Sequence, residues 1–276
     1  MSRNNWRNTL LKDITIGQFF PGESVIHRMD ARVKLLLTAA FIVMLFVANS
    51  IRALCVGVAF TLIVYPISGI PLKMMWKSVK PILPIIIITA FLNLFFIRTG
   101  DVYFHWKIIK ITEDGVKTAS FMAIRIVCLI IGSSILTYTT SPIDLTDAIE
   151  RLLSPLKKLK VPVHELAMMM TIALRFIPTL IEETDKIMSA QKARGADIET
   201  GGLIKKAKAL VPILIPLFVA SFRHAEELAL AMECRCYHGG EGRTRMKQLK
   251  MSVLDLFGAL FLCLFFAGVI IVNIIV

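Results

Sequence analysis

The sequence predicts an all-α integral membrane protein with about five transmembrane helices and a cytoplasmic-side domain of long helices. The chain of 276 residues is 56% hydrophobic, with a mean hydropathy of +0.70, which is more apolar than an ordinary soluble domain. The apolar residues are gathered into blocks that approach the roughly 20 residues needed to cross a bilayer as a helix. The basic residues, which give a net charge of +12, stand mainly between these blocks.

The predicted spans are separated by short polar segments. They cover residues 33–48, 53–70, 81–97, 115–139 and 253–276. The break at 49–52 (Asn-Ser-Ile-Arg) predicts a tight turn between the first two spans, and the mixed segment 98–114 predicts a polar loop between the third and fourth.

Charge orients these spans. The flanks 1–34 and 71–80 are basic, whereas the turn at 49–52 carries a single arginine. Because cytoplasmic loops carry the excess of Lys and Arg, we expect a cytoplasmic N-terminus and an outside C-terminus in a cell membrane. The predicted parts are a cytoplasmic segment (1–34), four spans (35–139), a cytoplasmic-side domain (140–252) and the last span (253–276).

The domain 140–252 contains two long helix-favouring runs, and each ends in an arginine-centred tripeptide. The first arginine motif is Ala193-Arg194-Gly195, and the second is Cys234-Arg235-Cys236. Prolines stand near the start of each run, and Gly195 and Gly239-Gly240 suit a helix C-terminus. Arginine in a last helical turn can simply complement the helix dipole. Since two such ends recur in one domain, we expect two exposed guanidinium groups that bind carboxylates of a partner.

Other polar residues of the sequence admit a structural or a functional interpretation. Cys234, Cys236 and His238, with His224 nearby, have a CxCxH spacing without a second cysteine pair, so we expect no metal site. Arg125 lies inside the fourth span, where it could either act in function or pair with an acid of another helix. The carboxylates that follow Pro178 (Glu182, Glu183 and Asp185) are predicted to form a solvated face.

Several functional classes are disfavoured. The sequence contains no GxxxxGK[ST], HExxH or GxSxG motif, so it proposes neither a nucleotide site nor a hydrolase, and we expect no cofactor in this chain. Its aromatic residues concentrate in the apolar blocks instead of interleaving with a basic face, so we expect no nucleic-acid partner. Met168, Met169 and Met170 suggest an adaptable apolar contact surface.

The sequence resembles the transmembrane T component (EcfT) of energy-coupling factor vitamin transporters. The match is carried by two segments, Ala193-Arg194-Gly195-Ala196-Asp197 and Ala231-Met232-Glu233-Cys234-Arg235-Cys236-Tyr237-His238-Gly239-Gly240. The layout of a basic N-terminus, membrane helices, a long helical insertion and a last span also fits. The second motif departs from the family's usual Ala-Arg-Gly form, because Cys234 and Cys236 replace small residues while the arginine is kept.

The resemblance implies a scaffold in a prokaryotic cell membrane, between two ABC-type ATPase subunits, which bind the ATP, and a membrane-embedded S component that binds the substrate. Arg194 and Arg235, with the residues that flank them, would each seat in a groove of one ATPase. Met168, Met169 and Met170 would contact the S component, which could be one of several interchangeable subunits. The protein would then not be an enzyme itself.

Two alternatives remain open from the residues alone. The first is an integral membrane enzyme with a cytoplasmic site around Cys234, Cys236 and His238. The second is a permease that conducts its substrate itself, with Arg125 and Asn93 along the path. A bound metal would favour the enzyme, and substrate binding by the isolated chain would favour the permease.

Overall fold

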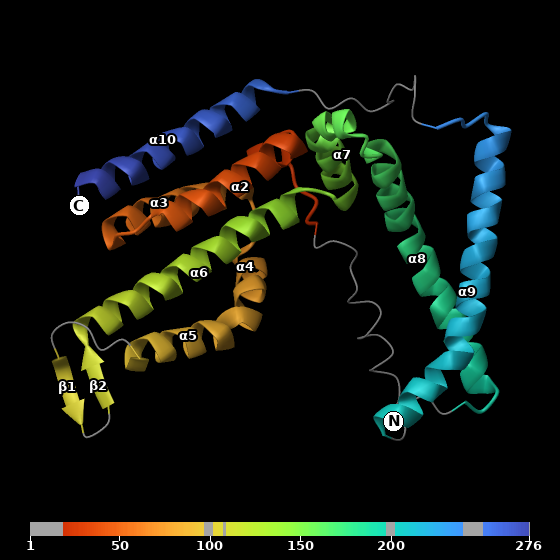
Figure 1. The fold of residues 1–276 in the computed structure, drawn as a ribbon, viewed down its shortest axis with the longest axis horizontal. Coiled ribbons are helices and arrows are strands. Elements are labelled where there is room, and N and C mark those ends of the chain that lie inside the picture. The colour runs from red at the N-terminus through yellow and green to blue at the C-terminus, as the bar shows by residue number, and fades with distance from the viewer. Residues whose placement is uncertain (1–18, 97–101, 107–108, 197–201, 240–250, 276) are drawn as a thin grey trace. The chain divides into compact units, whose positions relative to one another are not determined.

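The computed structural model divides the chain into two compact units (Figure 1). It describes residues 19–96, 102–106, 109–196, 202–239 and 251–275. We call residues 17–148 and 248–276 the bundle, and we call residues 149–247, to which 1–16 are assigned, the hairpin unit. The predicted N-terminal segment 1–34 therefore lies partly outside the described residues.

Nearly all of the described chain is helical, which confirms the all-α prediction. The bundle contains α1 (Val25–Arg28), α2 (Ala31–Val47), α3 (Ile51–Ser68), α4 (Leu72–Val79), the 3-10 turn η1 (Lys80–Ile82), α5 (Leu83–Phe96), α6 (Glu113–Thr139) and α10 (Val253–Ile275). The helix α7 (Pro142–Leu153) crosses the boundary between the units. The hairpin unit contains η2 (Ser154–Leu159), α8 (Val163–Ala193) and α9 (Leu203–Cys234).

Six of the described helical segments are long and apolar enough to cross a membrane. Four of them, 51–68, 72–96, 113–139 and 253–275, match predicted spans, and the other two are α8 and residues 208–234 of α9. The first predicted span corresponds to α2, whose 17 residues reach about 25 Å, slightly less than the roughly 30 Å hydrocarbon core. The candidates therefore outnumber the predicted spans because the two long helices of 140–252 are also apolar.

The segment predicted as a polar loop at 98–114 contains a β-hairpin. Strands β1 (Val102–Trp106) and β2 (Ile109–Thr112) pair antiparallel, with an irregularity between Val102 and Phe104. Thr112 then caps α6, because its hydroxyl accepts a hydrogen bond from the Gly115 N–H at 3.2 Å.

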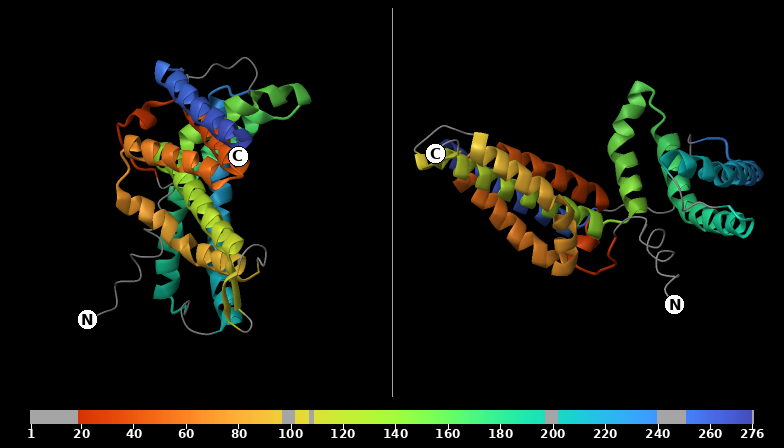
Figure 2. Two further views of the ribbon diagram at one scale, coloured as in Figure 1. Left: turned by 90° about the vertical axis from the view of Figure 1, so that its left-hand side faces the viewer. Right: turned by 90° about the horizontal axis from the view of Figure 1, so that it is seen from below.

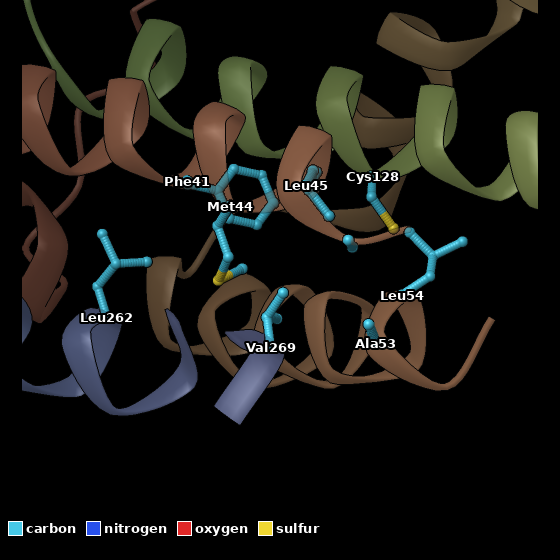
Figure 3. Close-up of a cluster of buried hydrophobic side chains, with 9 residues drawn as sticks. Phe41, Met44, Leu45, Ala53, Leu54, Cys128, Leu262 and Val269 are labelled. Carbon is cyan, nitrogen blue, oxygen red and sulfur yellow. The ribbon is translucent and has the colours of Figure 1, made fainter. Parts of the chain in front are cut away.

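The core of the bundle lies where α2, α3, α6 and α10 pack together. Figure 3 shows side chains from all four helices meeting in it, and the views in Figure 2 show these helices side by side. The buried members are Phe41, Met44, Leu45, Ala48, Ala53, Leu54, Cys128, Leu262 and Val269. Gly132 lets α6 approach α2 closely, since a Cβ at this position would lie 2.2 Å from the Phe41 ring.

Helix α10 holds both ends of α2 through hydrogen bonds. Near the start of α2, the buried Asp255 carboxylate accepts from the Asp30 N–H at 2.8 Å. At the other end, the Asn273 side chain donates to the Val47 carbonyl at 2.6 Å. The two helices therefore run parallel, and an acceptor meets the positive end of α2 while a donor meets its negative end.

Arg125 is also used inside the bundle. Its guanidinium donates to the carbonyl of Ala48, the C-cap residue of α2, and lies over the rings of Phe121 (4.4 Å) and Phe46 (5.9 Å). The sequence left open whether Arg125 acts in function or pairs with an acid. In the described structure it pairs with a helix end and two aromatic rings instead of an acid.

Candidate functional site

The first arginine motif is a Schellman C-cap. Arg194 is the C-cap residue of α8, and Gly195 follows it with a left-handed φ of +86°. The N–H of Gly195 donates to the Lys192 carbonyl and that of Ala196 to the Gln191 carbonyl, both at 3.0 Å. These bonds satisfy carbonyls that the helix end leaves open, so the backbone fixes where α8 stops and where Arg194 stands.

The second arginine motif has the same cap with a different residue at the critical position. Arg235 is the C-cap residue of α9, and Cys236 follows with a φ of +55°. The N–H groups of Cys236 and Tyr237 donate to the Glu233 and Met232 carbonyls, at 2.8 and 3.0 Å. The helix thus ends before Gly239-Gly240, where the sequence suggested its stop, because the cap is closed at Cys236.

Both motifs are open to solvent. Ala193, Arg194, Gly195, Cys234, Arg235 and Cys236 are all exposed. Among the residues that the structure describes, neither guanidinium takes part in an ion pair or a side-chain hydrogen bond. A Cβ added at Gly195 would meet nothing within 4 Å. Each motif therefore presents a free fork of donors at a helix end, which suits a carboxylate on a partner.

The two motifs lie at opposite ends of an antiparallel helix pair. Figure 1 shows α8 and α9 running in opposite directions. Gln191 near the end of α8 contacts Pro212 near the start of α9, whereas Phe176 earlier in α8 contacts His224 later in α9. Arg194 consequently lies at the end where α9 begins, and Arg235 lies at the far end of α9. With 32 residues at 1.5 Å each, α9 alone extends about 48 Å. Such a spacing suits two separate partner grooves.

The contact between α8 and α9 has a polar centre. The His224 ring stacks on Phe176 with centroids 5.9 Å apart, and its Nε2 lies 3.4 Å from Glu183 Oε2. Gln191 Nε2 donates to the Pro212 carbonyl at 3.2 Å. Glu183 is therefore half-buried against α9, which corrects its assignment to a solvated face. Glu182 and Asp185 are exposed, as predicted.

The three methionines lie in the first third of α8. Met169 and Met170 are exposed, and Met168 is half-buried. They stand more than 20 residues before Arg194 on the same helix, which corresponds to about 35 Å. The structure thus separates the predicted apolar contact surface from the first arginine motif.

Sequence reasoning found the end of α8 and predicted the end of α9 a few residues too late. It missed the residues that join α8 to α9. A signal for them was present, because a proline inside a helix deprives the carbonyl four residues earlier of its donor. Pro216 does this to Pro212, whose carbonyl accepts from the Gln191 side chain of α8.

Comparison with known proteins gives consistent matches over nearly the whole chain. Residues 22–246 match the family model CbiQ, described as cobalt transport protein. The chain is 57% identical over 254 residues to the energy-coupling factor transporter transmembrane protein EcfT of Clostridium kluyveri, covering 91% of this chain and 93% of that protein. It is 46% identical over 246 residues to the protein of the same name in Bacillus subtilis, covering 89% and 93%.

Proposed function

We propose that this chain, which belongs to the cobalt transport protein family CbiQ and to the EcfT transmembrane proteins within it, is the coupling scaffold of an ATP-driven importer. In this role it links two ABC-type ATPase subunits to a membrane-embedded S component that binds a vitamin or another micronutrient. The chain is a transporter subunit and not itself an enzyme, and the ATP is bound and hydrolysed by its partners.

One observation supports the ATPase contacts above all others. Arg194 and Arg235 cap two helices in the same way, are exposed, and stand at opposite ends of the α8–α9 pair. Each would seat in an acidic groove of one ATPase subunit. A charge-assisted joint of this kind resists sideways slip, since the guanidinium fork can hold a carboxylate through two parallel hydrogen bonds. Nucleotide-driven closing of the ATPases would then move both helices together.

The apolar side chains of α8 and α9 suit the second contact. Met169 and Met170 are exposed on α8, and Phe218 and Phe222 are exposed on α9 by 62% and 68%. Thioether side chains adapt to differently shaped partners. We assign Met168, Met169 and Met170 to the S component contact, which would let one scaffold serve several S components.

Charge and chain topology support the orientation in a bacterial membrane. Because α2 and α10 run parallel, both begin on the same side, and the positive-inside rule makes this side cytoplasmic. Helices α8 and α9 form an antiparallel pair, so whether they cross the bilayer or lie along it, α10 starts on the side where α6 ends. This arrangement supports an N-terminus inside and a C-terminus outside.

The two alternatives receive less support. The guanidinium of Arg125 is occupied by a helix end and two rings, so it is not presented to a permeation path. Cys234 and Cys236 flank the C-cap residue of α9 as exposed thiols, in a position that fits a docking motif better than an enclosed reaction site.

The test is co-purification of this chain with its two ATPase subunits. The double variant Arg194→Glu and Arg235→Glu should lose both ATPases, because reversing a paired interface charge costs about 2–5 kcal/mol per contact. Arg175→Glu with Arg223→Glu is the matched control, since both arginines are exposed on the same two helices. Normal ATPase binding by the Arg194/Arg235 variant, or equal loss in the control, would contradict the proposed docking.

A further inference from the structure

We propose that the crossing of α8 and α9 is a specific joint, in which Gln191 occupies a backbone site opened by Pro216. The joint ties the end of α8 that carries Arg194 to α9, and it leaves Arg235 at the end of an arm of α9 that extends beyond the crossing. The existence of the joint stands on the geometry of the two helices alone. Its consequence for transport rests on the function proposed above.

Pro216 creates the site for Gln191. In a regular helix the N–H of residue 216 would donate to the Pro212 carbonyl, but proline has no N–H. The Gln191 side chain supplies the missing donor from α8 at 3.2 Å. Pro178 opens the Leu174 carbonyl of α8 in the same way, yet among the described residues no α9 donor bonds to it. The Gln191 contact is thus particular to one carbonyl.

Gln191 also belongs to the cap of the first arginine motif. Its carbonyl accepts from the Ala196 N–H, which closes the Schellman motif around Arg194. One residue therefore ties the first motif to its own helix through the main chain and to α9 through the side chain. Arg194 stands three residues from this tie, so its position follows that of α9.

The other half of the joint lies around His224. Its ring stacks on Phe176, and its two nitrogens face the carboxylates of Glu183 at 3.4 Å and Glu227 at 3.7 Å. The Oε2 atom of Glu183 is buried and, within the described part of the chain, has no hydrogen-bond partner. Arg235 follows His224 by eleven residues, or about 16 Å of helix. Beyond the crossing, α9 diverges from α8 (Figure 1).

The two arginines are therefore mechanically unequal. A force on Arg194 acts on both helices at once through Gln191, whereas a force on Arg235 acts on α9 as a lever about the crossing. In the importer, the ATPase held by Arg194 would define the position of the joint. The ATPase held by Arg235 would swing the arm.

The joint is tested by distances between spin labels in the full chain in lipid nanodiscs, after its native cysteines are replaced by serine. Labels at Lys186 and Leu214 report on the braced side, and labels at Leu166 and Leu230 report on the arm; all four side chains are exposed. We expect a narrow distribution for the first pair and one at least twice as broad for the second.

Two substitutions should loosen the braced side equally. Gln191→Ala removes the donor, and Pro216→Ala restores an N–H that takes the Pro212 carbonyl back into α9. Each should broaden the 186–214 distribution about twofold, and the double variant should be no broader than either one. Gln191→Lys keeps a donor and should stay narrow, and Pro178→Ala should change nothing. An unchanged distribution in Gln191→Ala, or additive broadening in the double variant, would overturn the joint.

The consequence is tested in the assembled transporter. Gln191→Ala should lower uptake per ATP hydrolysed severalfold while both ATPases stay bound. If Gln191→Ala broadened the 186–214 distance distribution but left uptake per ATP hydrolysed unchanged, the joint would exist but would have no mechanical role in transport. If the wild-type chain bound no ATPase, the proposed function would fail, and the label distances would still decide whether the joint exists.

Discussion

Two arginines of the bundle and two of the hairpin unit are used in opposite ways. In the bundle, the Arg125 guanidinium donates a hydrogen bond to the Ala48 carbonyl and lies over two aromatic rings. Arg32 forms an ion pair with Asp30, with 2.7 Å between Nη2 and Oδ2. In the hairpin unit, Arg194 and Arg235 stand at helix ends, are exposed and are unpaired among the described residues. The same type of side chain thus stabilises the fold at two positions of the bundle and is available to a partner at two positions of the hairpin unit.

The difference teaches how to recognise a docking residue. A charge in an apolar region has to be satisfied, because leaving it alone is expensive. A charge at an exposed helix end carries little such cost, so nothing in the fold explains why it must be arginine. Unpaired arginines at exposed helix ends are therefore the better candidates for partner contact.

The largest expected effect comes from the same substitution made in both units. Arg125→Gln should lower the free energy of unfolding by about 2 kcal/mol, because it removes a charge-assisted bond to a helix end and the cation–π contacts, while relief of charge burial offsets part of that loss. Arg194→Gln should change it by less than about 0.5 kcal/mol. Unfolding in mixed micelles with increasing SDS measures both values. Equal destabilisation by the two substitutions would remove the distinction between the units.

A smaller effect is expected within the hairpin unit, at the caps. Cys236 takes a left-handed conformation that costs an L residue about 1–2 kcal/mol, and the first motif avoids that cost with Gly195. Cys236→Gly should stabilise the α9 cap by about 1 kcal/mol, and Gly195→Ala should destabilise the α8 cap by a similar amount.

Amide hydrogen exchange reports on both caps. Protection of the Tyr237 N–H should rise about fivefold in Cys236→Gly, and protection of the Ala196 N–H should fall about fivefold in Gly195→Ala, since 1.4 kcal/mol corresponds to a factor of ten. Protection of amides in the bundle should not change in either variant. If Cys236→Gly lowered Tyr237 protection, the strain at Cys236 would not be what distinguishes the two caps.

Much of this contrast could be predicted from the sequence. The arginine motifs and the stop of α8 at Gly195 follow from local cap chemistry, which depends on a few neighbouring residues. The partner of Arg125 could not be predicted, because the Ala48 carbonyl is a backbone group 77 residues away. The Gln191–Pro212 bond and the stacking of His224 on Phe176 are equally non-local. The strands β1 and β2 were not predicted, because they are only five and four residues long and lie in a segment of mixed polar composition.

The smallest expected effect concerns pH and the buried carboxylate of Asp30, whose side chain is 1% exposed. Burial alone would raise its pKa, but hydrogen bonds from the Arg32 side chain and backbone, with the charges of Arg32 and Lys34, outweigh burial and hold the pKa below its ordinary value of 3.8. A carboxylate with a lowered folded-state pKa contributes stability above its unfolded pKa. That stability is lost as the pH falls through the folded-state value.

Between pH 7 and pH 5 the contribution of Asp30 should therefore be constant, and it should decline only below about pH 4. The stability difference between the wild type and Asp30→Asn, measured by SDS unfolding across this range, should be largest at neutral pH and shrink in acid. Glu23→Gln removes a carboxylate that is 92% exposed in its pair with Arg28, so its difference should be near zero throughout. A stability difference for Asp30→Asn that grew toward acid would mean that the bundle keeps this carboxyl protonated. Arg32 would then not be held by an ion pair with Asp30, and the contrast between this arginine and the unpaired arginines of the hairpin unit would fail.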